Sequence, residues 1–269
     1  MIISDLDGTF LDSNSKLVQR NIDAIEYFKL NGGRFTFATG RNEQTLELLL
    51  PQTEDIINAP AILTNGSYIY DFQNKKRIDE VFLPFETSVA LINNVVSHFP
   101  DIGIRISTPY GFLCPNLSSK LKKDIWFYKD ITVFTTVNEL RKGSWNKIVF
   151  VDEPDKINEV YKYVKTLDLK DFNVTATSPV LLEILDKNAT KGIKVKSLKN
   201  LNGHTFTVYG VGDYENDFEL LKAADYAACP KNAIDSIKKI SDFILCDNNC
   251  GTIADLIKLI ENNLSTEEK

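Results

Sequence analysis

The sequence predicts an α/β fold in which a parallel-sheet core is interrupted by an inserted α+β domain. Three observations support this prediction. Apolar strand patterns alternate with helical patterns up to about residue 83, two helix-plus-hairpin units follow, and the alternation of strands and helices returns from Lys191. The chain has 269 residues, of which 43% are hydrophobic, so it can bury the cores of two domains.

The first core segment begins with a short apolar strand that ends at Ile3. A helix is expected over residues 17–30, because apolar side chains recur at helical spacing and Asn31-Gly32-Gly33 is a C-cap signal. The segment continues with a strand over residues 34–38, a helix over 42–50, and strands over 61–64 and 68–70 across an Asn-Gly turn. This alternation is typical of a parallel sheet.

The middle of the chain follows a different pattern. Its expected elements are a helix over residues 86–99, strands over 103–107 and 111–114, a strand over 147–151, a helix over 154–167, and paired strands over 172–177 and 181–185. Two helix-plus-hairpin units in succession are an α+β pattern, although no sequence repeat demonstrates duplication. We therefore expect an inserted domain over residues 84–186, within a core formed by residues 1–83 and 187–269.

The second core segment resumes the α/β pattern. Its expected elements are a helix over residues 192–201, a strand over 205–211, strands over 226–228 and 243–245 on either side of a helix over 233–240, and a final helix over 252–260. Together the two segments predict one α/β core that the inserted domain divides.

Charge and hydropathy argue against two classes, nucleic-acid-binding proteins and membrane proteins. A net charge of −6 and a pI near 5.1 argue against nucleic-acid binding, which needs a basic face. The short basic segment at residues 120–123 is expected to be a solvated face. The chain lacks an apolar run of roughly eighteen residues, and Asp5 precedes any leader-like segment, so we expect a soluble cytoplasmic protein without a membrane partner. The oligomeric state stays open.

Cysteine and histidine are expected to supply little chemistry. The four cysteines are scattered and form no Cys-x-x-Cys pair: Cys114, Cys229, Cys246 and Cys250. The spacing of the last two could suit a metal, but no histidine lies near in the sequence, so structural thiols are expected. The two histidines, His98 and His204, lack a hydrolytic Ser or Cys motif. The chemistry must therefore rest on carboxylates, hydroxyls and lysine.

Asp5 and Asp7 stand one residue apart, directly after the first apolar strand and before Gly8-Thr9. At the carboxyl end of a strand, Asp5 can attack phosphorus and form an aspartyl-phosphate. Asp7 can then protonate the leaving oxygen and later deprotonate water. A solvated Asp-Gly turn is the alternative for this segment, and a capping role is the alternative for the Asp7 carboxylate.

Two further segments can handle a phosphoryl group. Thr39 follows an apolar strand and opens the helix expected over residues 42–50, so its hydroxyl and the amides after it can donate to phosphate oxygens. An N-cap role for Thr39 is equally natural. Lys191 stands at the return to the core and can bring positive charge to the phosphoryl group and to Asp5. Arg41 and Asn65 border the same predicted site.

Three acids gather after the strand expected over residues 205–211: Asp213, Glu215 and Asp217. Together with Asp5 and Asp7 they make five carboxylates, which cannot share a pocket unpaired, so a hard cation is implied. Mg²⁺ fits best, because it favours octahedral oxygen ligation with few protein carboxylates and several waters. Neither candidate turn holds a G-x-G-x-x-G motif, so no dinucleotide site is expected.

Taken together, these motifs make the chain resemble the haloacid dehalogenase superfamily. Within it, the chain is similar to the Cof-type phosphatases, which have a Rossmann-like core and a large inserted cap of class IIB. The resemblance covers essentially the whole chain and rests on residues 5–9, 39–41, 191 and 212–217, with support from residues 65–66, 223–225, 232–233 and 251. Tyr214 departs from the pattern, because glycine is frequent there.

The resemblance implies a Mg²⁺-dependent phosphatase, a phosphoric monoester hydrolase whose inserted segment is a mobile cap that excludes water. It implies that the metal is held by Asp5, the main-chain carbonyl of Asp7 and Asp213, with Asp217 in a supporting position. The expected catalytic residues are Asp5, Asp7, Thr39 and Lys191, and the expected substrate-binding residues are Thr39, Gly40, Arg41, Asn65, Lys191 and Asn216.

The expected substrate is a small phosphorylated metabolite: a sugar phosphate, a nucleotide or a phosphorylated cofactor. A phosphomutase is the first alternative, separated by whether water can reach the aspartyl-phosphate. A non-catalytic phosphometabolite-binding protein is the second, although its usual signature, loss of a motif carboxylate or lysine, is absent here. Arg105, Tyr110 and Lys147 could reach a leaving group, but ordinary surface positions are expected for all three.

Overall fold

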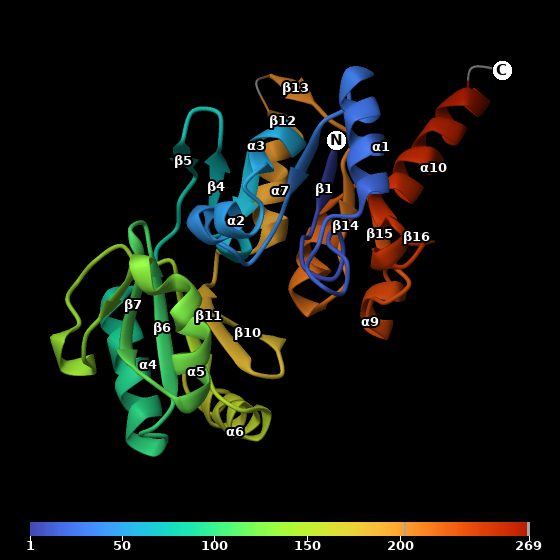
Figure 1. Ribbon diagram of the computed structural model, residues 1–269. Helices are drawn as coiled ribbons and strands as arrows, with labels where there is room; N and C mark the ends of the chain where they lie inside the picture. Colours follow the sequence, from blue (N-terminus) through green and yellow to red (C-terminus); the bar gives the residue numbers. More distant parts are fainter. Residues whose placement is uncertain (202, 268–269) are drawn as a thin grey trace. The chain divides into compact units, whose positions relative to one another are not determined.

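The structure is a computed structural model that describes residues 1–201 and 203–267. It divides into two compact units (Figure 1). The core unit comprises Met1–Asp79 and Thr190–Lys269, and the inserted unit comprises Glu80–Ala189. Each unit has its own hydrophobic core, so each is described by itself.

The core unit is built on a five-stranded parallel sheet with the order β16-β15-β14-β1-β2. Its strands are β1 (Ile2–Ser4), β2 (Phe35–Phe37), β14 (Tyr209–Val211), β15 (Tyr226–Pro230) and β16 (Phe243–Leu245). The first strand is central: Ile2 pairs with Phe35 on one side and with Tyr209 on the other. The strand order therefore reverses at β1, where open α/β sheets bind ligands.

Helices cover both faces of this sheet, as the alternating pattern predicts. On one face, α1 (Gln19–Leu30) and α10 (Thr252–Glu267) lie side by side and pack in the cluster that contains Ile2 (Figure 1). On the other, α7 (Lys191–Lys199) and α8 (Phe218–Ala223) pack in the cluster that contains Ile3. Successive side chains of a strand point to opposite faces, so neighbouring isoleucines serve different cores.

A small antiparallel sheet, β3-β4-β5, continues the core unit beyond β2. Its strands are β3 (Ala61–Leu63), β4 (Tyr68–Asp71) and β5 (Lys76–Ile78), and the 3₁₀ turn η1 (Thr64–Gly66) separates the first two. A parallel bridge between Ala38 and Ile62 joins it to the end of β2. Two short helices precede it, α2 (Glu43–Leu49) and α3 (Thr53–Ile56), of which the second was not predicted.

Three expected elements of the second core segment differ from the structure. The strand expected over residues 205–211 is wrong as one element: β13 (His204–Thr205) pairs with β12 (Asn200–Leu201), and β14 starts only at Tyr209. Gly203, with φ +78°, lets the chain turn back here. The helix expected over residues 233–240 shrinks to α9 (Asp235–Lys238), and the last helix, α10, is longer than expected.

The inserted unit is a six-stranded sheet with the order β10-β11-β9-β6-β7-β8. Its strands are β6 (Gly103–Thr108), β7 (Gly111–Asn116), β8 (Thr132–Phe134), β9 (Lys147–Val151), β10 (Phe172–Ser178) and β11 (Leu181–Asp186). Two helices, α4 (Phe85–His98) and α6 (Pro154–Val164), pack with Ile104 and Ile148 in one core on the same face. The two helix-plus-hairpin units therefore merge into one layer of strands under one layer of helices.

The other face of this sheet is partly covered by a segment that the sequence did not predict. It consists of α5 (Ser119–Asp124) and the 3₁₀ segment η2 (Ile125–Ile131), which lead to the edge strand β8 and the 3₁₀ turn η3 (Val137–Glu139). Leu121 and Ile125 pack with Cys114, Val149 and Val151. This smaller cluster covers only part of the face, and polar side chains occupy strand positions beside it.

Within the described residues, no helix is long and apolar enough to cross a membrane.

Asn21 ties three distant segments of the core unit together. Its side chain is fully buried; Nδ2 donates to the Phe10 carbonyl at 3.1 Å, and Oδ1 accepts from the amides of Ile253 and Ala254, each at 3.1 Å. The first amides of a helix lack partners within the helix, so α1 caps α10 through this side chain. The same amide group fixes the segment that follows Asp5.

We expect Asn21→Ala to lower the free energy of unfolding by about 1–3 kcal/mol, because it leaves buried backbone groups without partners. Urea unfolding measures this loss. Asn31→Ala is the matched control: its amide donates to the Tyr27 carbonyl at the exposed end of α1, and its loss should change stability by no more than about 0.5 kcal/mol. Equal losses in the two variants would contradict the role assigned to Asn21.

Candidate active site

Three strands of the core sheet end beside one another, and each is followed by residues predicted for the site. The Asp5 amide donates to the Val211 carbonyl at 2.8 Å, and the Ala38 amide donates to the Ser4 carbonyl at 2.8 Å. The segments that leave β1, β2 and β14 therefore start side by side at the carboxyl edge of the sheet. The sheet brings residues 5–7, 39–41 and 212–217 to this edge.

A cluster of three carboxylates lies at this edge. One oxygen each from Asp5, Asp213 and Asp217 lies within 4.8 Å of the others. The buried ammonium of Lys191 is 2.6 Å from an oxygen of Asp5 and 2.6 Å from an oxygen of Asp217. Lys191 is the first residue of α7, whose preceding residue, Thr190, caps the helix by accepting from the Ile193 amide.

Burial and mutual repulsion shift the protonation of this cluster. Burial, followed by the nearby Asp217 carboxylate, raises the pKa of Asp5 well above its usual range. The same two causes raise the pKa of Asp213 to about 6. Burial alone would lower the pKa of Lys191, but the carboxylates of Asp217 and Asp5 raise it above its ordinary value. The lysine is therefore a permanent cation.

The donor set fits a divalent cation with oxygen ligands. Three carboxylates face a single ammonium, so the cluster carries uncompensated negative charge once all three are ionised. The ligand atoms are hard oxygens, the kind that Mg²⁺ prefers. Asp5 and Asp213 are the members with oxygens left for such an ion, since both oxygens of Asp217 have other partners.

Asp217 organises the cluster from behind. It is fully buried: Oδ1 accepts from Lys191, and Oδ2 accepts from the amides of Asp213 at 2.9 Å and Tyr214 at 3.1 Å. The 3₁₀ turn η4 (Glu215–Asp217) directs this side chain inward, whereas Glu215 is exposed. The expected pocket of five carboxylates is therefore wrong: within the described residues three cluster, because the tight turn points its two acids to different sides.

Gly8 and Thr9 shape the approach to Asp213. Gly8 has φ +83°, and a Cβ at this position would lie 2.6 Å from an Asp213 carboxylate oxygen, so only glycine fits without displacing the carboxylate. The buried hydroxyl of Thr9 donates to Asp213 Oδ1 at 2.7 Å. Thr9 is a site residue for which sequence analysis gave no role, although it lies within the first motif.

The Asp7 carboxylate lies outside the cluster and is held by Arg41. The guanidinium donates through Nε at 2.9 Å and through a terminal nitrogen at 2.8 Å, a bidentate pair. The Asp7 side chain is 46% exposed, so this acid faces solvent rather than the buried cation. The structure thus gives Arg41 a partner that sequence analysis did not foresee, because the two residues are 34 positions apart.

The remaining predicted residues follow β2 and β3. The Thr39 hydroxyl accepts from the Arg41 amide at 3.2 Å, but an N-cap role for Thr39 is wrong: Asn42 caps α2 by accepting from the Thr45 amide. Asn216 donates to the Asn65 side-chain oxygen at 3.2 Å. A Cβ at Gly40 would lie 3.1 Å from Asn65, so the three segments are in close contact.

A polar brace holds the loop that follows Asp7. Asn232 donates to the Gly8 carbonyl at 2.7 Å and accepts from the Asn248 amide at 3.1 Å. The buried Asn248 side chain in turn donates to the Leu11 carbonyl at 2.9 Å. This brace fixes the loop beside Gly8 from residues more than two hundred positions away, which no local pattern could indicate.

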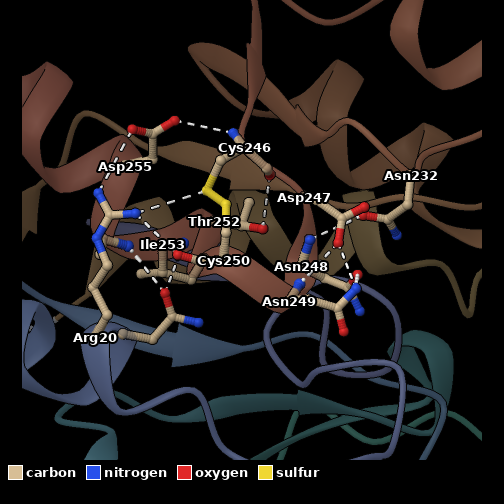
Figure 2. Close-up of a disulfide and its surroundings, with 12 residues drawn as sticks. Arg20, Asn232, Cys246, Asp247, Asn248, Asn249, Cys250, Thr252, Ile253 and Asp255 are labelled. Atoms are coloured by element: carbon tan, nitrogen blue, oxygen red, sulfur yellow. Dashed lines mark hydrogen bonds and ion pairs between the residues drawn. A yellow bond between two sulfur atoms is a disulfide. The ribbon is translucent and has the colours of Figure 1, made fainter.

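Cys246 and Cys250 flank Asn248 and are joined in a disulfide across the 3₁₀ turn η5 (Asn248–Cys250) (Figure 2). The expectation of structural thiols is therefore wrong for this pair. Their Cα atoms are 6.2 Å apart, within the range that a disulfide spans. The expectation holds for Cys114 and Cys229, which are free and buried. Arg20 packs against the closed loop and donates to the Cys250 carbonyl at 2.9 Å.

Two of the three residues considered on the inserted unit do not have the surface positions expected of them. Lys147 is buried, and its ammonium donates to a Glu183 carboxylate oxygen at 2.8 Å. Arg105 is largely covered by the rings of Phe112 and Tyr128. Tyr110 is 90% exposed, as expected.

A family model for haloacid dehalogenase-like hydrolases matches residues 2–257. The chain belongs to this family. The match spans both units, so the resemblance predicted from the motifs is confirmed, and the predicted α/β fold is confirmed as well. Members of the family are hydrolases, in keeping with a carboxylate and lysine cluster at the carboxyl edge of a parallel sheet.

Named relatives and solved structures of this hydrolase family cover nearly the same length. A 5-amino-6-(5-phospho-D-ribitylamino)uracil phosphatase of Bacillus subtilis is 24% identical and covers 94% of this chain and 95% of its own. A pyridoxal phosphate phosphatase of Escherichia coli is 23% identical over 96% of this chain and 97% of its own. A haloacid dehalogenase-like hydrolase from Bacteroides thetaiotaomicron superposes with a TM-score of 0.82 at 23% identity, covering 96% of this chain and 98% of its own.

The raised pKa of Asp213 makes a prediction about stability in the absence of metal. A carboxylate that binds its proton more tightly in the folded state destabilises that state as the pH rises through the folded pKa. With EDTA present, the free energy of unfolding of the wild type relative to Asp213→Asn should fall by up to about 3 kcal/mol between pH 4 and pH 7.

Urea unfolding across this pH range measures the effect of Asp213. Asp23→Asn, which changes an exposed carboxylate on α1, is the control and should show no comparable pH dependence. A stability difference for Asp213→Asn that is flat with pH would show that burial does not disfavour the ionised form of this group.

Proposed function

We propose that the chain is a Mg²⁺-dependent phosphatase that hydrolyses a small phosphorylated metabolite through an aspartyl-phosphate on Asp5. The observation that carries this proposal is the buried Asp5–Lys191–Asp217 arrangement beside Asp213, at the edge where β1 and β14 end. The two named relatives act on phosphorylated substrates, one of them a phosphorylated cofactor, which supports the same class of substrate for this chain.

Asp5 is the proposed nucleophile. One of its carboxylate oxygens attacks phosphorus, the bond from phosphorus to the leaving oxygen breaks, and a mixed anhydride forms on the side chain. Lys191 holds this carboxylate in place at 2.6 Å and places a fixed positive charge beside the reacting group. Because Lys191 is buried and carries a permanent charge, it orients Asp5 without taking part in proton transfer.

Asp7 is the proposed acid and base. It gives a proton to the leaving oxygen in the first step and takes one from the attacking water in the second, which returns Asp5 and releases inorganic phosphate. Its solvent-facing position suits this exchange. Arg41 orients the carboxylate through its bidentate contact, so this residue controls where the acid points.

The ion would be held by the carboxylates of Asp5 and Asp213, with the main-chain carbonyl of Asp7 as a further proposed ligand. Asp217 would support it indirectly, by fixing Lys191 and the Asp213 backbone. When bound, Mg²⁺ supplies charge neutralisation for the phosphoryl oxygens. Thr9 contributes by holding one oxygen of Asp213, which sets the direction of the other.

The other residues at this edge would bind the phosphoryl group. Thr39, Gly40, Asn65 and Asn216 offer a hydroxyl, an amide and two side-chain amides, and the contacts between them keep these groups together. We also propose that residues 84–186 act as the cap of the enzyme and that residues 1–83 and 187–269 form its catalytic core, consistent with two independently packed units.

The test is the release of inorganic phosphate from sugar phosphates, nucleotides, pyridoxal phosphate and flavin mononucleotide, with Mg²⁺ and with EDTA. Release that depends on Mg²⁺ supports the proposal. Transfer of the phosphoryl group to an added sugar phosphate without phosphate release would instead identify a mutase, and no turnover at all would leave a binding protein.

Asp5→Asn should abolish turnover while leaving the fold intact, because it removes the nucleophile and one metal ligand but little volume. Phosphate release and a circular dichroism spectrum measure the two effects. Asp23→Asn serves as the control with an exposed carboxylate changed in the same way, and its activity should equal that of the wild type. Turnover near the wild-type level in Asp5→Asn would refute the covalent mechanism.

Asp7→Ala should slow turnover by about 10²-fold or more, because both steps lose their proton carrier. The carboxylate cluster should stay intact, since the Asp7 side chain is not part of it. Rapid-quench kinetics on a substrate with a good leaving group, which needs little protonation, should show a smaller defect in the first step than in the second. An unchanged turnover rate would show that the Asp7 side chain is not the acid and base, and would leave only its main-chain carbonyl as a proposed metal ligand.

A further inference from the structure

Arg105 occupies an unusual position on the inserted unit. It lies on β6, and its guanidinium is 4.8 Å from the ring centre of Phe112 and 5.8 Å from that of Tyr128. The two rings meet edge to face at 5.8 Å and form a corner around the cation. Such contacts stabilise a guanidinium and fix its plane, but they supply no hydrogen-bond acceptor.

This cation has no counter-ion among the residues that the structure describes. The Nε atom of Arg105 is buried without a hydrogen-bond partner, and the guanidinium makes no ion pair with a described residue. The carboxylates of Glu183 and Asp124 act on it only from a distance, and Glu183 is already paired with Lys147 at 2.8 Å. Burial lowers the pKa of Arg105, which expresses the cost of covering an unpaired charge.

Further donors lie on the same face of the sheet. Ile104 and Ile106 point into the core under α4 and α6, so Arg105 and Ser107 share the opposite face. Ser107 pairs in register with Lys147 of β9, and its hydroxyl makes no hydrogen bond to a described residue. A guanidinium and a hydroxyl without acceptors thus lie beside the Lys147–Glu183 ion pair, whose carboxylate is already engaged by the lysine.

Protein interiors rarely keep a covered cation unpaired, because its desolvation is not repaid. The guanidinium presents parallel N–H groups in a rigid fork, which matches the two oxygens of a carboxylate or phosphate. The aromatic corner holds this fork in one orientation, so an oxyanion would meet a preorganised donor set.

We propose that Arg105, together with Ser107, forms a binding site for a small oxyanion, a carboxylate or a phosphate group, on the inserted unit. Two sources can provide this group. It is either a second anionic group on the substrate, a possibility that rests on the proposed phosphatase function, or a separate small anion that regulates the chain.

The first experiment measures binding without using catalysis. Thermal unfolding of the full chain is followed in EDTA with increasing malonate, and the wild type is compared with Arg105→Met. The methionine keeps an apolar stem against Phe112 and removes the cation. Arg141→Gln, at an exposed arginine of the same unit, is the matched control.

The wild type and Arg141→Gln should gain about 5 °C at a malonate concentration about a hundredfold above its dissociation constant, and Arg105→Met should lose this specific gain. Without malonate, Arg105→Met should melt at or above the wild-type temperature, because it removes an unpaired covered charge. Equal gains in all three proteins would overturn the proposal, since the anion would then bind elsewhere.

The second experiment distinguishes the two sources. Arg105→Gln is assayed on 3-phosphoglycerate, which carries a carboxylate, and on glycerol 3-phosphate, which lacks one. A rise in KM of about 10-fold or more for the first substrate alone assigns the anion to the substrate.

If the KM of Arg105→Gln equals that of the wild type for both substrates, and malonate no longer stabilises Arg105→Met, the site binds a separate anion. If neither substrate reacts, the phosphatase is judged on the substrate panel of the proposed function, and the unfolding experiment still decides the anion site. Unchanged KM ratios together with undiminished malonate stabilisation in Arg105→Met would overturn the proposal in both forms.

Discussion

The buried ammonium of Lys191 is the interaction on which the active centre depends. It lies 2.6 Å from carboxylates that are 186 and 26 positions away in the chain, and so joins the end of β1 to the turn before α8. Without this ammonium, either carboxylate would be an unpaired buried charge, which lowers the free energy of unfolding by about 3–5 kcal/mol. The same contacts that hold Asp5, the proposed nucleophile, therefore help to define the fold of the core unit.

The excess of carboxylates over ammonium groups is what makes the cluster chemically useful. A fully compensated cluster would be more stable but would offer no reason to bind a cation. Both carboxylate oxygens of Asp217 accept hydrogen bonds, so this residue supports the cluster. Asp5 and Asp213 each keep an oxygen that can coordinate a cation. Thr9 and the brace through Asn232 hold the first loop in place, so the geometry exists before any ligand arrives.

The inserted unit also contains a charge without a counter-ion among the described residues, but here the charge is positive. Lys147 and Glu183 form a buried ion pair, whereas Arg105 is covered by aromatic rings and has no carboxylate of a described residue at contact distance. In the core unit an excess of buried anions points to a cation, and in the inserted unit an unpaired cation points to an anion. In both units a local imbalance of charge is the feature that suggests a ligand.

The sequence by itself determined the order of elements and most of the chemical groups. Hydrophobic periodicity and turn residues are local, so they located three strands and five helices within a few residues: β1, β2, β9, α1, α2, α4, α6 and α7. They also placed Asp5, Thr39 and Asp213 after strands, and parallel strands necessarily bring such positions to one edge. For the same reason, a change in the period of the pattern led to the prediction of an inserted domain over residues 84–186.

Only the tertiary structure decided which groups touch. The turn at η4 sends Asp217 inward and Glu215 outward, Arg41 closes on Asp7, and Cys246 meets Cys250. The split between β13 and β14 likewise depends on a pairing with β12 rather than on apolar content. Direction and pairing of side chains follow from non-local packing and exact backbone turns, whereas composition and spacing along the chain record only which groups are available.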